Sequence, residues 1–134
     1  MKSFLLIGVN HLGTMLADRM QELGHEVMAA DRYEERINEI QAIVTDAQIG
    51  DSTNKEFLKS LGVNNYDICF VTIADDFESS LITTVLLREL GAKKIVARAN
   101  RDIQEMLLLR NGADEVIRPE RLAAEWAVDR FGRE

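Results

Sequence analysis

The first 31 residues carry the pattern that most constrains how this chain can fold. An apolar run over residues 4–7 ends at a turn that begins with Gly8 and closes with Gly13, and a stretch with helical spacing follows. A second apolar run over residues 27–30 ends on Asp31. Strand, glycine turn, helix, strand and acid is the order of a dinucleotide-binding βαβ unit.

The details of this unit support nucleotide binding with one departure. Asp31 follows Gly13 at close to the spacing that places a carboxylate on the ribose hydroxyls. The helix start offers unpaired N–H groups to a phosphate. Asn10 replaces the usual middle glycine, and its side chain is expected to crowd the backbone approach to a pyrophosphate. The alternative is an α/β turn of the same shape that binds no nucleotide.

Composition excludes several other classes of function. A formal charge of −7 argues against nucleic acid as the main partner. No apolar run approaches the roughly 20 residues that cross a bilayer, and the N-terminus lacks a signal-peptide cleavage pattern. The lone Cys69 lies in an apolar segment and is expected to be a buried thiol. Two histidines and one cysteine argue against a transition-metal site. These features favour the cytoplasm.

Strand and helix patterns alternate through the rest of the chain. This alternation predicts a Rossmann-like α/β fold, a doubly wound parallel six-stranded sheet in a single domain over residues 1–134, with no residues left for a separate substrate domain. The further strands are expected at 43–49, 67–74, 94–99 and 115–117, and the further helices at 33–42, from about 53 to 61, at 76–90, 103–109 and 119–131.

Two local expectations concern the middle of the chain. Asp51 or Ser52 is expected to cap the helix that follows, because short polar side chains accept from free amides at helix starts. In the helix over 76–90, the apolar spacing predicts that Leu81, Val85 and Leu86 face the sheet.

Ligands of open parallel sheets bind beyond the carboxyl ends of the strands. Each polar residue there has a plainer explanation: Asp51 as a helix cap, Arg32 and Arg98 as surface charges, and the acids at helix starts as partners of the helix dipole. No nucleophile–base constellation can be assembled, so no catalytic residue is expected and binding without catalysis is favoured. The expected cleft comprises residues 8–13, 31–32, 50–53, 73–75, 98–100 and 118–120.

Four stretches together resemble the N-terminal lobe of RCK domains, also called KTN or TrkA-N, as in TrkA-like and KtrA-like subunits. The resemblance covers essentially the whole chain. The GDST element with its following strand, and the GADEVIRPE ending, are more specific than the glycine turn. The stretches are LLIGVNHLGTMLADRMQELGHEVMAAD, AQIGDSTNKEFLKSLGVNNYDICFVTIADD, LLRELGAKKIVARA and LLLRNGADEVIRPE.

The resemblance implies a cytoplasmic regulatory subunit, peripheral to the membrane through a potassium channel or transporter partner that it gates. Such subunits assemble as dimers and then as rings, so a homodimer is expected here, with an octameric ring as a further candidate. Their lobes bind an adenine nucleotide, namely NAD(H), ATP or ADP, with AMP as a further candidate. Nucleic acid binding and direct membrane insertion are not expected.

The resemblance also assigns roles to individual positions. The phosphates are expected to bind at the turn over residues 8–13, and the adenosine ribose at Asp31, with Arg32 and Tyr33 beside it. The adenine is expected at residues 51–52, after the third strand, and a ribose–phosphate at residues 98–100, after the fifth strand. Glu120 is expected to face a ligand-associated cation or a neighbouring subunit. The assigned positions are Gly8, Asn10, His11, Leu12, Gly13, Asp31, Arg32, Tyr33, Asp51, Ser52, Ile73, Ala74, Asp75, Arg98, Ala99, Asn100, Gln104 and Glu120.

The sequence departs from the family pattern at two positions, and two competing hypotheses stay open. Asn10 stands where members commonly have glycine, and His11 where KtrA-like members have arginine, which puts ATP-specific sensing in question. The usual C-terminal lobe does not follow, so the chain is either a fragment or does not use the ligand of that lobe. The alternatives are a small NAD-dependent oxidoreductase, or its cofactor domain, and a ring-forming structural subunit with a degenerate site.

The final helix is the expected dimer or linker element. Trp126 and Phe131 give it an apolar stripe that would otherwise face water. The alternative is that this helix docks back on the sheet of its own chain.

Overall fold

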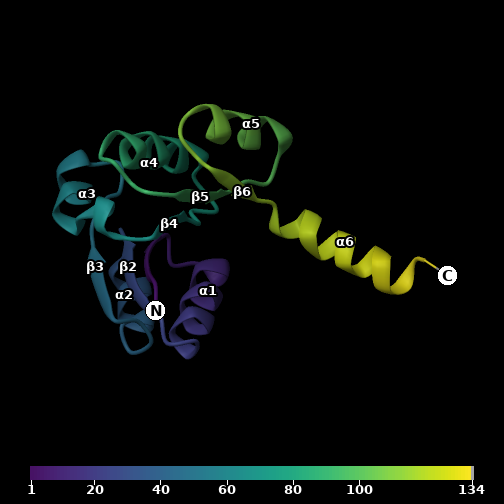
Figure 1. Ribbon diagram of the computed structural model, residues 1–134, viewed down its shortest axis with the longest axis horizontal. Coiled ribbons are helices and arrows are strands. Elements are labelled where there is room, and N and C mark those ends of the chain that lie inside the picture. The colour runs from purple at the N-terminus through teal and green to yellow at the C-terminus, as the bar shows by residue number, and fades with distance from the viewer. Residues whose placement is uncertain (134) are drawn as a thin grey trace.

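A six-stranded parallel sheet forms the centre of the computed structural model, which describes residues 1–133 (Figure 1). The strand order β3-β2-β1-β4-β5-β6 confirms the predicted doubly wound topology, with its switch point between β1 and β4. The strands are β1 (Ser3–Ile7), β2 (Glu26–Asp31), β3 (Asp46–Ile49), β4 (Ile68–Val71), β5 (Ile95–Arg98) and β6 (Glu115–Ile117). The helices are α1 (His11–Glu22), α2 (Glu34–Ile40), α3 (Lys55–Leu61), α4 (Phe77–Glu89), α5 (Asp102–Arg110) and α6 (Pro119–Phe131), with a 3₁₀ turn at Val63–Asn65.

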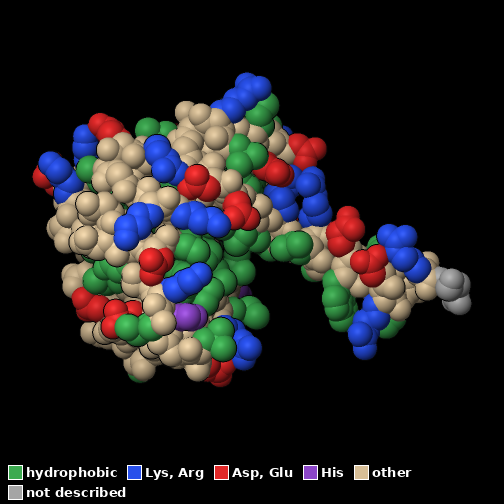
Figure 2. Space-filling view, in the orientation of Figure 1, with side chains coloured by type: hydrophobic (Ala, Val, Ile, Leu, Met, Phe, Trp, Pro, Cys, Tyr) green, Lys and Arg blue, Asp and Glu red, His purple; other side chains and the backbone are tan. Residues whose placement is uncertain are grey.

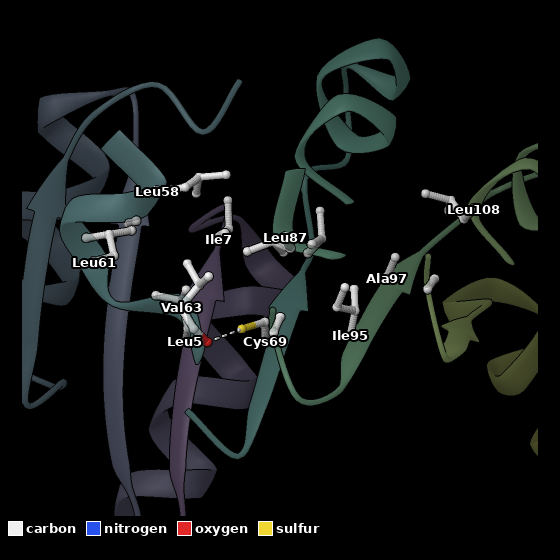
Figure 3. Close-up of a cluster of buried hydrophobic side chains, with 14 of the residues drawn as sticks. Leu5, Ile7, Leu58, Leu61, Val63, Cys69, Leu87, Ile95, Ala97 and Leu108 are labelled. Carbon is white, nitrogen blue, oxygen red and sulfur yellow. Dashed lines mark hydrogen bonds between the residues drawn. The ribbon is translucent and has the colours of Figure 1, made fainter. Parts of the chain in front are cut away.

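The inner strands β1, β4 and β5 are buried on both faces, which explains their apolar sequences, whereas the edge strands β3 and β6 are partly exposed. Along β1, Leu5 and Ile7 pack with the α3, α4 and α5 side, whereas Phe4 and Leu6 pack with α1 and α2. Figure 3 shows the first of these clusters, in which the Cys69 thiol donates to the Val63 carbonyl. Burial raises the pKa of this thiol to about 12, so Cys69 is a core residue and not a nucleophile.

Two strands are shorter than predicted by three or more residues, and β5 lacks one expected residue at each end. The strand expected over 43–49 begins only at Asp46, because the amides of Ile43 and Val44 bond back to the Ile40 carbonyl in a turn. The strand expected over 67–74 ends at Val71, the last β4 residue paired with β5. The apolar residues beyond each end pack against the domain without joining the sheet ladder.

The prediction for the buried face of α4 was wrong in part. Val85 is 39% exposed, and Leu81 and Leu86 are only partly buried. The fully buried side chains include Thr83 and Leu87. The buried Thr83 and Thr84 hydroxyls have partners: Thr83 lies 2.7 Å from the Ser52 hydroxyl, and Thr84 donates to the Ser80 carbonyl at 2.9 Å. Apolar spacing alone therefore misplaces the buried face.

The cap of α3 also differs from the prediction. Asn54, not Asp51 or Ser52, accepts the amide of Phe57 at 3.1 Å. Asp51 instead accepts the amide and hydroxyl of Thr53 within its own turn. The side chains of Asp51 and Ser52 therefore lie near the carboxyl end of β3 and do not cap α3.

The last helix, α6, projects away from the rest of the molecule (Figure 1). None of its residues is buried, and Leu122, Trp126 and Phe131 are 62%, 59% and 74% exposed. Figure 2 shows its hydrophobic side chains next to open space. Docking of this helix on the sheet of its own chain is therefore contradicted.

Among the described residues, no helix has both the length and the apolar character needed to span a bilayer.

Candidate functional site

The glycine turn joins β1 to α1 and lies against the segment after β4. Gly8 has φ +100°, and a Cβ there would lie 2.8 Å from the Ile73 nitrogen. A Cβ on Gly13 would lie 2.3 Å from the Gly8 carbonyl oxygen, which already accepts from the Thr72 hydroxyl at 2.6 Å. Both glycines are therefore required by close backbone approach.

Asn10 caps α1 and does not adopt a left-handed conformation. Its backbone is extended at φ −105°, its side-chain oxygen accepts the Gly13 amide at 3.1 Å, and its side-chain amide donates to the Thr72 carbonyl. The side chain thus uses one amide of the helix start. The amides of His11 and Leu12, with the dipole end of α1, remain for an anion.

Replacing Asn10 with glycine is expected to strengthen phosphate binding and weaken the fold. The variant frees the Gly13 amide for an anion, whereas the lost cap and Thr72 contact cost roughly 1 kcal/mol of unfolding free energy. Titration calorimetry with ADP and urea denaturation measure the two effects. Unchanged or weaker ADP affinity would show that the Asn10 side chain does not compete with the phosphate.

Asp31 is the buried acid at the carboxyl end of β2. Its side chain is 3% exposed. One carboxylate oxygen accepts the Val9 amide at 2.8 Å and the other accepts the Tyr33 amide at 2.9 Å. Arg36 lies 3.5 Å from the first of these oxygens. Asp31 therefore ties β2 to the glycine turn and retains acceptor capacity toward the cleft, since a carboxylate has about four acceptor sites.

The first pocket is a cavity of about 220 Å³ at the carboxyl ends of β1, β2, β3 and β4. It brings together nine of the positions predicted from the sequence and five that were not predicted. The predicted ones are Gly8, Asp31, Arg32, Tyr33, Gly50, Asp51, Ser52, Ile73 and Asp75; the others are Ile7, Ala30, Arg36, Asp76 and Ser79.

The rim of this pocket carries charges of both signs. The guanidinium groups of Arg32 and Arg36 lie 5.6 and 4.8 Å from the centre of the Tyr33 ring. Hydrogen bonds from Thr53 lower the pKa of Asp51, and hydrogen bonds from Ser79 lower that of Asp76, with a smaller contribution from Arg32 in each case. The rim therefore pairs an aromatic platform with ionised carboxylates and cations.

The second pocket, a cavity of about 170 Å³, lies beside the first at the ends of β4 and β5. Ile73 and Asp75 line both pockets. The Arg98 Nε is buried without a hydrogen-bond partner, although Nη2 of the same group lies 3.5 Å from the Asn100 side-chain oxygen. The second pocket is lined by Ile73, Ala74, Asp75, Phe77, Arg98, Ala99, Asn100 and Gln104, of which only Phe77 was not predicted.

Other predicted positions lie outside both pockets. Gly13 and Leu12 belong to the turn and to the start of α1, and His11 is exposed there. Glu120 is exposed in the first turn of α6. Arg118, which the sequence placed at the cleft, forms ion pairs with α5 instead. These residues do not line the cavities that a nucleotide base or sugar would fill.

Arg36 is the positively charged residue that the sequence patterns did not place at the first pocket. It lies on α2, three residues after Tyr33, so helical spacing places it on the same side as that ring. The helical spacing from Tyr33 therefore indicated the position of Arg36, although a search of the strand ends alone did not reveal it.

Within residues 1–133, no cluster of three or more His, Cys, Asp or Glu side chains is arranged to hold a metal ion.

Together, the sheet order, the glycine turn and the acid at the end of β2 define a Rossmann-like α/β domain of the nucleotide-binding class. The family model of the TrkA-N domain matches residues 4–119. The chain belongs to the TrkA-N domain family.

Similar proteins support this assignment. The Ktr system potassium uptake protein C of Bacillus subtilis (strain 168) is 40% identical over 120 residues, which cover 90% of this chain and 54% of the relative. The chain spans about half the length of the Ktr system relatives it matches.

Solved structures share the fold at low sequence identity. The NAD(P)-binding domain of an exopolyphosphatase-related protein from Archaeoglobus fulgidus superposes with a TM-score of 0.87 at 21% identity, and the match covers 100% of each chain. The GsuK channel bound to NAD superposes with a TM-score of 0.83 at 15% identity, covering 93% of this chain and 23% of the channel chain.

Proposed function

We propose that this chain is a nucleotide-binding, non-enzymatic regulatory component of a potassium uptake system. The observation that carries the proposal is Asp31, a buried carboxylate that lines the first pocket and bonds to the backbone of the glycine turn. The 40% identity to a Ktr system potassium uptake protein supports the physiological context.

The ligand class that fits is an adenine nucleotide: NAD(H), ATP, ADP or AMP. In this proposal the adenosine occupies the first pocket, with its ribose hydroxyls at Asp31 and its base near Asp51 and Ser52. Phosphates meet the start of α1, where free amides and the helix dipole favour negative charge. A second ribose or phosphate enters the second pocket near Arg98.

Regulation requires that the nucleotide bind one conformation of an assembly more tightly than another, because equal affinity shifts no equilibrium. A tenfold preference corresponds to about 1.4 kcal/mol per site. Several sites coupled in a homodimer or a ring would add such contributions. We place this assembly on the cytoplasmic side, beside a membrane channel or transporter subunit that it gates.

Titration calorimetry with NADH, NAD, ADP, ATP and AMP tests the nucleotide proposal. Saturable heat with at least one of them is expected. Heats indistinguishable from dilution for all five would contradict nucleotide binding and favour a structural subunit with a degenerate site. Sustained oxidation of NADH in the presence of a panel of carbonyl compounds would contradict the non-enzymatic role, because turnover requires a catalytic group.

The exposed apolar side chains of α6 are proposed to pair with a second copy of the chain. Trp126→Ala is expected to shift the protein from dimer toward monomer, since an interfacial tryptophan commonly contributes about 2 kcal/mol or more to association. Size-exclusion chromatography with light scattering over a range of concentrations measures the shift. Met15→Ala, on the exposed face of α1, is the matched control. An unchanged dimer in Trp126→Ala would exclude α6 from the interface.

A further inference from the structure

Arg118 holds the start of α6. It follows β6 directly, and its side chain is 13% exposed. Its Nη1 lies 2.9 Å from Asp102 Oδ1 and 2.7 Å from Glu105 Oε1. Both acids lie in the first turn of α5. A largely buried guanidinium shared by two carboxylates is better ordered than an isolated surface pair.

Arg121 adds a second contact between the same elements. Its Nη2 lies 3.0 Å from Asp102 Oδ1, and its Nη1 lies 3.8 Å from Glu105 Oε1. No residue of α6 is buried, and these ion pairs connect the start of α6 to the first turn of α5. Pro119 restricts the backbone at the same point.

The acids that hold α6 belong to the segment that forms the wall of the second pocket. Asn100 and Gln104 line this pocket, and the backbone N–H of Asn100 donates to the side-chain oxygen of Gln104 at 3.0 Å. Arg118 Nη2 lies 3.5 Å from the Asn100 carbonyl oxygen. On its other side, Asn100 is contacted by Arg98. Arg118 thus contacts Asn100 in the wall of the second pocket and also lies directly before the first residue of α6.

We propose that Arg118 is the positioning residue through which the second pocket sets the direction of α6. The inference rests on the proposed function, because it requires a nucleotide group to enter the cleft. An acceptor group of the ligand that bonds to Nη2 of Arg98 competes with the Asn100 side-chain oxygen, which lies 3.5 Å from that nitrogen. The resulting shift of Asn100 reaches α6 through Arg118 and not through the sheet.

The single tryptophan of the chain reports on this movement. Trp126 lies on α6, eight residues beyond Arg118, or about 12 Å at the rise of an α-helix. ADP and NAD are suitable probes because neither fluoresces. Each is expected to change the acrylamide quenching of Trp126 in the wild-type chain. In Arg118→Gln this change is expected to be lost, while calorimetric affinity stays within about threefold of wild type.

Matched variants separate positioning from general damage. Arg110→Gln removes an exposed arginine at the end of α5 and should keep the full response. Arg118→Lys keeps the charge without the forked geometry and should keep part of the response. A ligand-dependent change that persists in Arg118→Gln overturns the inference, and so does wild-type protein that binds ADP while Trp126 quenching stays constant.

A measurement without ligand tests the positioning role separately from nucleotide binding. Time-resolved anisotropy of Trp126 is expected to show faster local motion in Arg118→Gln than in Arg110→Gln. Equal motion in the two variants overturns the role of Arg118. Absence of heat with every nucleotide, together with faster motion in Arg118→Gln, would instead contradict the proposed function and leave the anchoring of α6 by Arg118 supported.

Discussion

Replacing Gly13 with alanine is expected to lower the free energy of unfolding by about 3 kcal/mol. Alanine in a helix ordinarily stabilises relative to glycine, so the expected sign is reversed here. The new Cβ would lie 2.3 Å from the Gly8 carbonyl oxygen and 3.0 Å from the Thr72 hydroxyl. These two atoms are hydrogen-bonded to each other, so neither can withdraw without breaking the contact between the turn and the residue that follows β4.

Gly24→Ala provides the control for this change. Gly24 has φ +88° and nothing within 4 Å of an added Cβ, so only the backbone conformation is penalised, by about 1 kcal/mol. Urea denaturation followed by circular dichroism gives both values. Wild-type stability in Gly13→Ala would mean that α1 can move away from the turn and that the contact is not essential.

Replacing Asp31 with asparagine is expected to lower adenine nucleotide affinity by roughly 100-fold, because two charge-assisted hydrogen bonds to the ribose become neutral or are lost. The fold should also lose about 2 kcal/mol. Each carboxylate oxygen accepts a backbone amide, from Val9 and from Tyr33. The new side-chain NH₂ group must therefore meet one of these donors and leave it unpaired.

Asp18→Asn is the matched control for Asp31. It makes the same chemical change on an exposed position of α1, away from both pockets. Calorimetry with the tightest-binding nucleotide, performed where denaturation curves show each variant to be folded, compares the affinities. Equal affinity in Asp31→Asn and wild type would place the ribose elsewhere and remove the main support for the proposed binding mode.

The order of the elements was predictable because the inner strands of a doubly wound sheet are buried on both faces, and their sequences are therefore apolar runs. Phe4 to Ile7 shows this most clearly, since its residues serve two clusters on opposite sides. Strand ends were less predictable. Ile43 and Val44 are apolar because they pack against α2 and β2, and apolar character alone does not distinguish a turn from a strand.

The sequence predicted the site residues that lie at the ends of strands, and it did not predict the residue that a helix contributes to the pocket. Gly8 and Asp31 lie at strand ends, and the topology brings these ends together. Arg36 reaches the first pocket from α2, which the strand pattern does not specify. Arg118 ends a strand too, but the acids of α5 bind it away from the cleft, a pairing that requires three-dimensional proximity of segments distant in sequence.

The burial of Cys69 has a practical consequence for following this domain in solution. A thiol with 0% exposure and a pKa near 12 reacts too slowly with maleimides to compete with an accessible cysteine. A cysteine introduced at Ala123 of α6 would therefore accept a dye or spin label selectively while the native residue stays in place. Interprobe distances in an assembly could then be measured on a chain with a single substitution.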